Sequence, residues 1–512
     1  MTDIVTRTLA ADHTTPVRAY AALRAQSTGR SSFLFESVVP GERWGRYSIL
    51  GYRARSEGKY PPGGNAIRLI SHAVQQLEAP EGLAARFSQA LIGYIAYDAV
   101  HPVHGIKPWP NEGDLARMMR DTTVVVFDNL KQTLSIAGRT QNAVDRCAWE
   151  MTHGPELTPL PPPDPNGVPE HVAVSMDDTK YMGKVERAKE YIRAGDAFQI
   201  VLARTFTSPM READPFDVYR ALRVLSPSPY LYFLDFAETP MAPALAIAGA
   251  SPETMVRLEH GQVTLRPIAG TRPRGATPEE DTRLAEELLQ DPKERAEHVM
   301  LIDLARNDAG RVCEPGSVTM TQNMAVERCS HVMHIVSEIT GTKRADVTAG
   351  DVVEATFPAG TLTGAPKVRA TQIIRELETG PRGIYGGAIG YLSGDGTVDL
   401  AIAIRTVVAA WGELHVTAGA GIVEGSVPEL EAQETRNKAR AGLAAIHAAQ
   451  LAAVAREEAA AAAKARAEKA AASAASAAEP AAPPAAAEAA EPPDAGETAE
   501  PPAAGAGSPS EP

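Results

Sequence analysis

The sequence predicts an α+β fold, and two observations support this. Short apolar segments bounded by Gly-Asp-Gly and Trp-Gly turns have the pattern of β-strands. Longer segments with apolar residues on one face, ending near glycine, have the pattern of α-helices. The chain has 512 residues, of which 44% are hydrophobic, so it suffices for two or three folded units or for one large one.

The first part of the chain, residues 1–155, contains mixed strands and helices. Thr122–Phe127 (TTVVVF) predicts a buried strand, and Leu91–Val100 is a further apolar segment. The stretch Glu156–Glu170 contains six prolines, which exclude helix and central strand. We therefore expect an amino-terminal region over 1–155, a Pro-rich linker over 156–174 and a second region over 175–447.

The second region has an α+β pattern. The expected helices are Asp178–Ala194, which ends at Gly195, then Glu294–Ala305 and Pro428–His447. The expected strands are Phe198–Phe206, Tyr230–Phe236, Tyr385–Ser393, Val398–Ala409 and Leu414–Ala418.

The end of the chain, 448–512, is a low-complexity tail rich in Ala, Pro and Glu. Residues 451–469 are able to extend a helix, whereas after Ala471 there are seven acidic residues, no basic ones and many prolines. Such a segment buries too little apolar surface to become ordered, so we predict a disordered tail. The tail also supplies about half of the net charge of −14, a charge that argues against nucleic acid as a partner.

The cysteine content and the hydropathy favour a cytoplasmic protein. Three cysteines without a CxxC spacing fit a reducing compartment. We find no signal peptide and no run of about 18 apolar residues, so we expect no membrane partner.

Two Glu-x-x-Glu steps lie far apart in the sequence. One is formed by Glu294 and Glu297, the other by Glu431 and Glu434. Residues at i and i+3 share a helix face, and two such faces brought together offer the oxygen ligands that Mg²⁺ prefers. Each step alone is also common on solvated helices, but the apolar residues after Glu297 indicate a half-buried helix.

Glycines and an arginine predict an anion site near residues 405–421. Gly419-Ala420-Gly421 follows an expected strand, where glycines let backbone N–H groups approach an anion. Arg405 ends the apolar strand LAIAIR, and its guanidinium suits a carboxylate. An edge arginine that reaches solvent is the alternative interpretation.

Two further motifs leave their roles open. Phe357–Lys367 (FPAGTLTGAPK) has the composition of a phosphate-binding loop but lacks the G-x-x-x-x-G-K-[ST] spacing. His331 and His334 stand at i and i+3, and either one is able to act as an acid or base. The residues alone thus indicate an enzyme for a small carboxylate substrate, with a binding or structural protein as the alternative.

Several long segments together resemble the chorismate-utilising enzymes. They are RPIAGTRPRG, EHVMLIDLARND, VMHIVSEITG, FPAGTLTGAPK, YGGAIGYL, IAIRT and GAGIVEGSVPELEAQETRNKA, in order across residues 178–445. Upstream, Phe33–Gly51 looks like the tryptophan-binding segment of the anthranilate synthase component I branch. The resemblance implies a two-layer sandwich of large, mostly antiparallel sheets with helices outside.

The resemblance also implies roles for particular residues. Glu297 and Glu434 would hold Mg²⁺ on the ring carboxylate of chorismate, supported by Glu294 and Glu431. Substrate binding would involve Gly270, Thr271, Tyr385, Arg405, Gly419, Ala420, Gly421 and Lys438. The implied catalytic positions are Gln199, Thr361 and His334, with His334 favoured over His331 because it fills the second histidine of VMHIVS.

Two positions indicate which reaction the resemblance implies. Aminodeoxychorismate synthases carry a nucleophilic lysine where this chain has Ala269, and isochorismate and salicylate synthases carry a water-activating lysine where it has Gln199. Without either amine, direct addition of ammonia is expected, as in anthranilate synthases. The sister activities, or an inactive regulatory homologue, are the alternatives.

The resemblance further implies two partners. No cysteine stands in a G-x-C-x-G setting, so we expect ammonia to come from glutamine through a separate amidotransferase subunit. Tryptophan is the expected feedback inhibitor, bound by Glu36, Ser37, Pro229, Tyr230 and Leu231. The alternative for FLFES is a plain core strand. Phe35, Ser226 and Leu231 depart from the residues usual in that pocket.

Overall fold

The computed structural model describes residues 4–37, 45–240, 242–329 and 332–477. The chain divides into two compact units, Met1–Arg456 and Glu457–Pro512. The disorder predicted for the tail falls mainly on residues 478–512, which lie outside the described residues.

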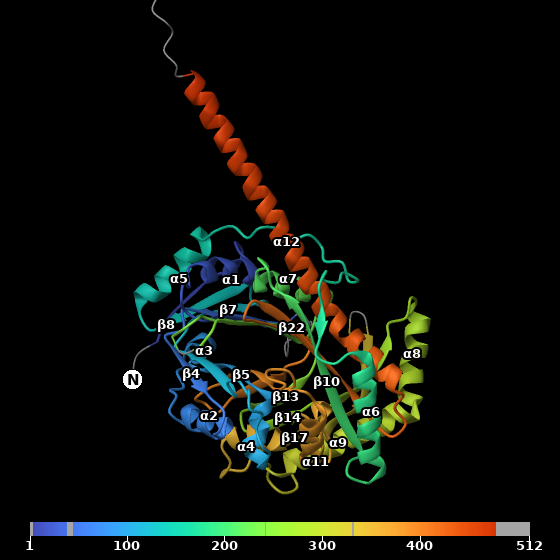
Figure 1. The fold of residues 1–512 in the computed structure, drawn as a ribbon. Helices are drawn as coiled ribbons and strands as arrows, with labels where there is room; N and C mark the ends of the chain where they lie inside the picture. Colours follow the sequence, from blue (N-terminus) through green and yellow to red (C-terminus); the bar gives the residue numbers. More distant parts are fainter. Residues whose placement is uncertain (1–3, 38–44, 241, 330–331, 478–512) are drawn as a thin grey trace, which may run out of the picture. The chain divides into compact units, whose positions relative to one another are not determined.

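Two large antiparallel sheets form the first unit (Figure 1). The 12-stranded sheet contains, in spatial order, β1 (Val5–Ala10), β8 (Thr133–Gly138), β7 (Thr123–Asp128), β3 (Tyr47–Tyr52), β2 (Ser32–Glu36), β11 (Tyr230–Phe236), β12 (Leu245–Ser251), β21 (Thr406–Ala410), β22 (Glu413–Ile422), β10 (Gln199–Pro209) and β18 (Gly364–Ala365), with β9 (Ala173–Val174) on β10. The 10-stranded sheet contains β15 (Ile268–Pro273), β17 (Val332–Thr342), β14 (Gln262–Leu265), β13 (Thr254–Glu259), β20 (Val398–Ile402), β19 (Ala388–Leu392), β5 (Leu91–Ile95), β6 (Ala116–Arg120) and β4 (Ser56–Tyr60), with β16 (Thr319–Arg328) on β17.

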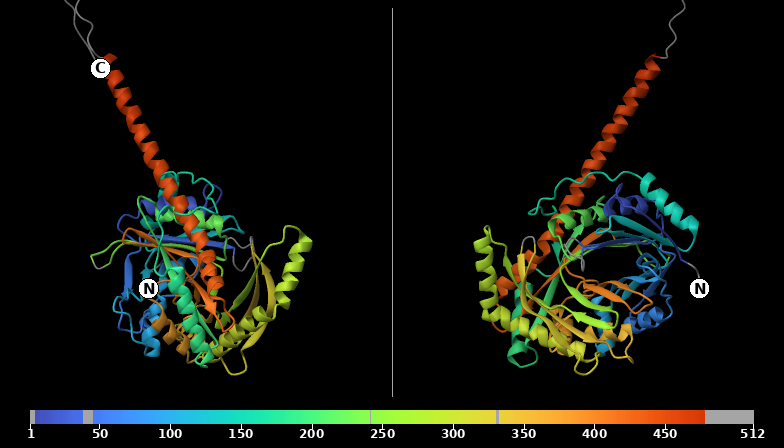
Figure 2. Two further views of the ribbon diagram at one scale, coloured as in Figure 1. Left: turned by 45° about the vertical axis from the view of Figure 1, so that its right-hand side comes forward. Right: turned by 180° about the vertical axis from the view of Figure 1, so that it is seen from behind.

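The helices are α1 (Pro16–Ala25), α2 (Ala66–Gln75), α3 (Leu83–Gln89), η1 (Tyr97–Ala99), α4 (Val100–His104), α5 (Gln141–His153), α6 (Asp178–Arg193), α7 (Pro215–Leu225), α8 (Pro278–Gln290), α9 (Pro292–Gly310), α10 (Ala349–Thr356), η2 (Gly360–Leu362), α11 (Lys367–Leu377) and α12 (Pro428–Ala477). Most of those in the first unit lie on the outer faces of the two sheets, as the views in Figure 2 also show. Helix α3 differs, because its Ala84 and Phe87 join the core between the sheets. The predicted α+β class and the two-layer arrangement are thereby confirmed.

The hydrophobic core has three main layers, because most strands bury both faces. Residues of β2, β11 and β12 meet those of β5, β19 and β20 between the sheets, as with Tyr94 and Phe236, whose ring centroids are 5.7 Å apart. Outside the first sheet, α1, α5, α7 and the first part of α12 complete a second layer. Outside the second sheet, α2, α10 and the end of α9 complete a third.

Two of the places where the chain crosses between the two sheets lie next to each other. β12 belongs to the first sheet and β13 to the second, whereas β20 belongs to the second and β21 to the first. The crossovers are hydrogen-bonded to each other, from Ile402 N to Glu253 O (3.0 Å) and from Ala250 N to Arg405 O (3.1 Å). The prediction of one strand over Val398–Ala409 was therefore wrong, because the chain changes sheets at 403–405.

Most other expected elements are present with shifted ends. Tyr230–Phe236 and the start of α12 agree with the prediction, and α6 ends one residue earlier than expected, before Gly195, whose φ is +84°. Leu91–Val100 divides into β5 and the η1–α4 turn. Strand β19 begins only at Ala388, so Tyr385 lies in the turn before it. Among the described residues, no helix combines the length and hydropathy needed to cross a membrane.

Candidate active site

The second of these crossovers and the turn before β19 bring the side chains of Arg405 and Tyr385 into one region. Gly386 N donates to Ala403 O (2.9 Å), which ties the turn of Tyr385 to the crossover that carries Arg405. Arg405 has a φ of +52°, and burial lowers the pKa of its guanidinium, near which Tyr385 and Glu434 lie. A buried guanidinium of this kind provides a site for an anionic group.

Carboxylates from α9 and α12 are neighbours of one another, and Glu434 is also a neighbour of Arg405. Gln199 Nε2 donates to Glu297 Oε1 (3.0 Å). Burial, followed by the neighbouring Glu294 carboxylate, raises the pKa of Glu297, and Glu434 adds to the effect. On α12, burial and then Glu434 raise the pKa of Glu431. The four predicted metal ligands are thus electrostatic neighbours, and their mutual repulsion favours a bound cation.

A lysine links the carboxylates to β22. Lys438 Nζ lies 2.6 Å from Glu434 Oε1 and donates to Gly419 O (3.0 Å). Among the described residues, three side chains with ligand atoms within 4.8 Å of one another are found at Asp98, His101 and Glu112, not at the four glutamates. No three of the four glutamates meet this distance, so a Mg²⁺ ion held here would need water and substrate oxygens to complete its ligands.

The glycines of the predicted anion loop lie inside a strand. Gly419, Ala420 and Gly421 pair with Ala203, Leu202 and Val201 of β10. The prediction that they follow the strand was wrong, because β22 continues to Ile422. A side chain here would nevertheless displace its neighbours, since a Cβ on Gly421 would lie 2.5 Å from Gln199 Nε2 and one on Gly419 would lie 2.7 Å from the Tyr385 hydroxyl.

His334 and Thr271 face each other across β17 and β15. His334 Nδ1 lies 3.0 Å from Gly270 O and 3.1 Å from Thr271 Oγ1. Since a carbonyl only accepts, Nδ1 carries the proton, and Nε2 is the basic nitrogen of the neutral ring. Burial lowers the pKa of His334, so the ring is neutral near pH 7 and suits a proton acceptor. His331 lies outside the described residues.

A carboxyl group that sequence reasoning missed lies at the first crossover. Burial raises the pKa of Glu253 to about 8, so this side chain is protonated at neutral pH. Thr361 Oγ1 donates to Glu253 Oε1 (3.0 Å), and Lys438 is a charged neighbour. The available signal was an acidic residue directly after the buried strand LAIAGAS, in Ser251-Pro252-Glu253.

A buried ion pair beneath the site was also missed. Arg382 Nη2 lies 2.6 Å from Glu378 Oε1 and also donates to Val201 O (2.8 Å), while Ala203 N donates to the same Glu378 oxygen (2.9 Å). This network fixes β10 beside the turn that carries Tyr385. Glu378 and Arg382 are four residues apart but lie in a loop, so helical periodicity in the sequence does not identify the pair.

The five predicted inhibitor residues line one cavity of about 180 Å³. Glu36, which is buried, accepts hydrogen bonds from Tyr219 Oη (2.6 Å) and Arg223 Nε (3.0 Å). The buried Ser37 hydroxyl has no hydrogen-bond partner among the described residues. The cavity therefore offers a polar group that a ligand is able to satisfy.

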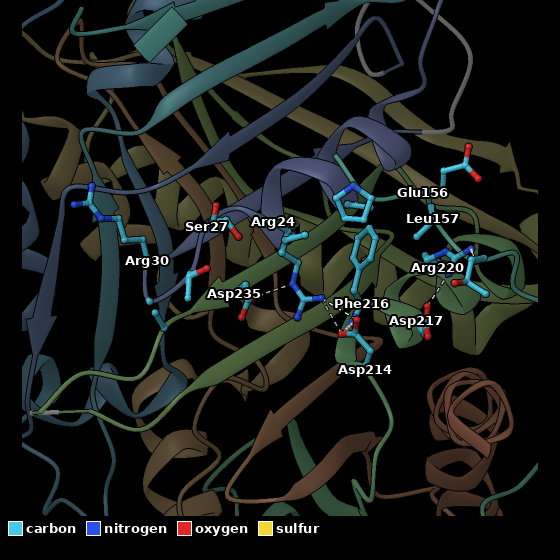
Figure 3. A pocket seen from close by; sticks show the side chains of 18 of the residues that line it. Arg24, Ser27, Arg30, Glu156, Leu157, Asp214, Phe216, Asp217, Arg220 and Asp235 are labelled. Atoms are coloured by element: carbon cyan, nitrogen blue, oxygen red, sulfur yellow. Dashed lines mark hydrogen bonds and ion pairs between the residues drawn. The ribbon is translucent and has the colours of Figure 1, made fainter. Parts of the chain in front are cut away.

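A larger cavity of about 720 Å³ lies elsewhere and contains none of the predicted site residues. Figure 3 shows Arg24 between Asp235 and Asp214, at 2.6 and 2.9 Å, and Arg220 directed at Asp217. These five charged side chains are paired with one another. The cavity therefore differs from the candidate active site, where the glutamate carboxylates repel one another.

Comparisons with known proteins agree with the predicted resemblance. Residues 48–444 match a family model described as chorismate binding enzyme. The chain is 42% identical to anthranilate synthase component 1 of Pseudomonas putida over 476 residues, which cover 86% of this chain and 94% of the relative. It is 42% identical to the Thermus thermophilus component 1 over 462 residues, covering 87% and 98%.

Two solved structures are also similar. The crystal structure of anthranilate synthase component I from Streptococcus pneumoniae matches with a TM-score of 0.68 and 35% identity, over 85% of this chain and 99% of that one. The menaquinone-specific isochorismate synthase of Escherichia coli matches with a TM-score of 0.67 and 19% identity, over 87% and 95%, which shows a shared fold alone.

Proposed function

The chain belongs to the chorismate-binding enzyme family, and from this premise we propose that it converts chorismate and ammonia into anthranilate and pyruvate. The observation that carries this proposal is the 42% identity to component 1 of an anthranilate synthase over 94% of that relative. The absence of an amine at Ala269 and Gln199 supports it, since neither a covalent route nor activation of water by lysine is then available.

Magnesium is the expected cofactor. Glu297 and Glu434 would hold it, with Glu294 and Glu431 beside them, because crowded carboxylates that raise each other's pKa favour a divalent cation. When bound, the ion withdraws electron density from the ring carboxylate of chorismate. Arg405 and Tyr385 would bind the enolpyruvyl carboxylate.

The proton transfers follow from the protonation states of two side chains. With Oε1 accepting from Thr361, Glu253 carries its proton on Oε2 and delivers it to the departing hydroxyl group, which leaves as water. His334 Nε2 accepts the proton released by the added ammonia. The sequence left open whether His334 acts as an acid or a base, and we assign it as the base because its neutral ring is a weak donor near pH 7.

Use of glutamine would require a partner subunit. Hydrolysis of glutamine by cysteine needs a reactive thiolate, but burial raises the pKa of Cys147, Cys313 and Cys329. A separate amidotransferase subunit is therefore the proposed source of ammonia in vivo.

The tryptophan cavity is the proposed regulatory site. Glu36 and the unpaired Ser37 hydroxyl are suited to the ligand's ammonium group, and Pro229 and Tyr230 to its indole ring. Arg223 would have to give way, since it pairs with Glu36.

The test incubates the purified chain with chorismate, magnesium and either ammonium or glutamine, and identifies the product by fluorescence and chromatography. We expect anthranilate with ammonium, none with glutamine alone, and none after chelation of the metal. Aminodeoxychorismate, isochorismate or salicylate as the product would replace the proposal by a sister activity. Absence of turnover in a folded, chorismate-binding chain would indicate a regulatory homologue.

A further inference from the structure

A second group of ionisable side chains lies outside the proposed active site. Asp98 comes from η1, His101 from α4, and Glu112 from the loop that follows α4. Each offers one ligand atom, and these atoms all lie within 4.8 Å of one another. Asp98 and His101 are three residues apart on one helical turn, which places them on the same face.

The group is buried and incompletely satisfied. Asp98 is 3% exposed, His101 2%, and the Glu112 side chain 1%. His101 Nδ1 lies 2.5 Å from Glu112 Oε1. The other carboxylate oxygen, Glu112 Oε2, is buried and has no hydrogen-bond partner among the described residues. An unpaired, buried carboxylate oxygen beside two other ligand atoms indicates a missing cation.

The neighbouring arginines are engaged elsewhere. The Arg382 guanidinium donates to Glu378 (2.6 Å), Val201 O (2.8 Å) and Leu362 O (2.6 Å). The Arg375 guanidinium donates to Lys107 O (3.1 Å) and Pro108 O (3.2 Å). Among the described residues, the side-chain hydrogen bonds thus give these two buried carboxyl groups one partner able to carry a positive charge, the His101 imidazole.

The backbone orients the two carboxylates. Gly383 N donates to Asp98 Oδ2 (2.7 Å), and Trp109 N donates to Glu112 Oε1 (2.8 Å). A carboxylate has about four lone-pair sites, so each group keeps capacity for a further partner. Hydrogen bonds that orient the ligands in this way are typical of metal sites.

We propose that Asp98, His101 and Glu112 bind a divalent first-row transition metal ion, for which zinc is the best match. One imidazole and two carboxylates form a mixed nitrogen and oxygen set, with a water as the fourth ligand of a tetrahedral site. The ion joins η1, α4 and the loop after α4, and the hydrogen bond from Gly383 N to Asp98 connects it to the turn two residues before Tyr385. Its role is to stabilise this wall of the fold, and it does not depend on the proposed reaction.

The experiment titrates the metal-free full chain with zinc in the presence of excess magnesium, which occupies the glutamate site. We expect one high-affinity zinc ion per chain and a rise in the melting temperature. His101→Gln and Glu112→Gln should each weaken zinc binding by about tenfold or more. His104→Gln, on the same helix but outside the group, and Glu297→Gln, in the other site, should bind zinc as the wild type does.

Two outcomes would overturn the proposal. If the wild type binds no zinc, the group is a buried histidine–glutamate pair. If both variants bind zinc as the wild type does, the ion lies at other residues. Should either variant fail to fold, X-ray absorption of the zinc-loaded wild type decides: one imidazole with oxygen ligands supports the site, and sulfur ligands or several imidazoles contradict it.

Discussion

At the scale of single residues, burial sets the protonation states on which the proposed acid and base roles depend. Glu253 and His334 are both shielded from water, and in each case desolvation disfavours the charged form. The carboxyl therefore keeps its proton and the imidazole remains neutral at the same pH. Two groups whose ordinary pKa values would give the opposite roles thus become an acid and a base.

Glu253→Gln should lower kcat by about 10²–10⁴-fold while KM changes little, because the amide keeps the shape but has no acidic proton. In the wild type the proton is lost as the pH rises through about 8, so activity should fall on the alkaline side of the profile. The variant's residual activity should lack that descending limb. The measurement is a profile of kcat against pH for both proteins. If the variant keeps the alkaline decrease in activity, a group other than Glu253 causes that decrease.

Gly421→Ala should impair catalysis more than folding. The added Cβ would lie 2.5 Å from Gln199 Nε2, the end of a flexible side chain that then moves away from Glu297. We expect kcat/KM to fall by about 10²-fold and the free energy of unfolding to fall by about 1 kcal/mol. Gly425→Ala is the control, since a Cβ there meets nothing within 4 Å. If the two variants had equal kcat/KM, Gln199 would have no role in the candidate active site.

At the scale of elements, the sequence pattern located strands and helices better than their connections. Tyr230–Phe236 was predicted to the residue, because apolar periodicity is a local property. The break at 403–405 was not predicted, because it arises where β20 joins one sheet and β21 joins the other. Glu253 was missed for the same reason, since its partner Thr361 stands 108 residues away in the sequence. Sequence patterns therefore identify which residues are buried, but not which buried residues contact each other.

The strand β2 carries the predicted regulatory contact at its carboxyl end. Ser37→Phe should place a ring in the cavity of about 180 Å³ and weaken tryptophan inhibition by at least about tenfold. Turnover with ammonia should persist, because the cavity contains none of the predicted catalytic residues. Inhibition curves and tryptophan calorimetry measure the effect, with Ser135→Ala on β8 as the control. Unchanged sensitivity to tryptophan would exclude this cavity as the inhibitor site.

At the scale of the whole molecule, both sheets combine strands from the two halves of the sequence. β2 pairs with β11 in one sheet, and β5 pairs with β19 in the other. The cavity with the five inhibitor residues and the crossovers of the candidate active site are thus built on the same two sheets. Because both sheets line this cavity, a ligand that changed their packing would also change the geometry at the crossovers.

The second compact unit should be dispensable for folding and turnover. Residues 457–471 of α12 are exposed and rich in alanine, and the unit Met1–Arg456 contains every residue of the candidate site. Deletion after Arg456 keeps the ion pair between Arg456 and Asp217 and the contacts of Ile446 with the core. We expect the melting temperature to shift by no more than about 2–4 °C.

A shorter chain provides the contrast. Deletion after Gly442 removes Ala445, Ile446, Ala448 and Ala449 from the core, together with the hydrogen bond from Gln450 Nε2 to Ser208 Oγ (3.2 Å). The free energy of unfolding should then fall by several kcal/mol, since each lost buried group leaves a cavity. Calorimetry and ammonia-dependent kinetics on the two truncated chains separate these outcomes. If deletion after Arg456 lowered stability as much as deletion after Gly442 does, residues beyond 456 would contribute to the fold.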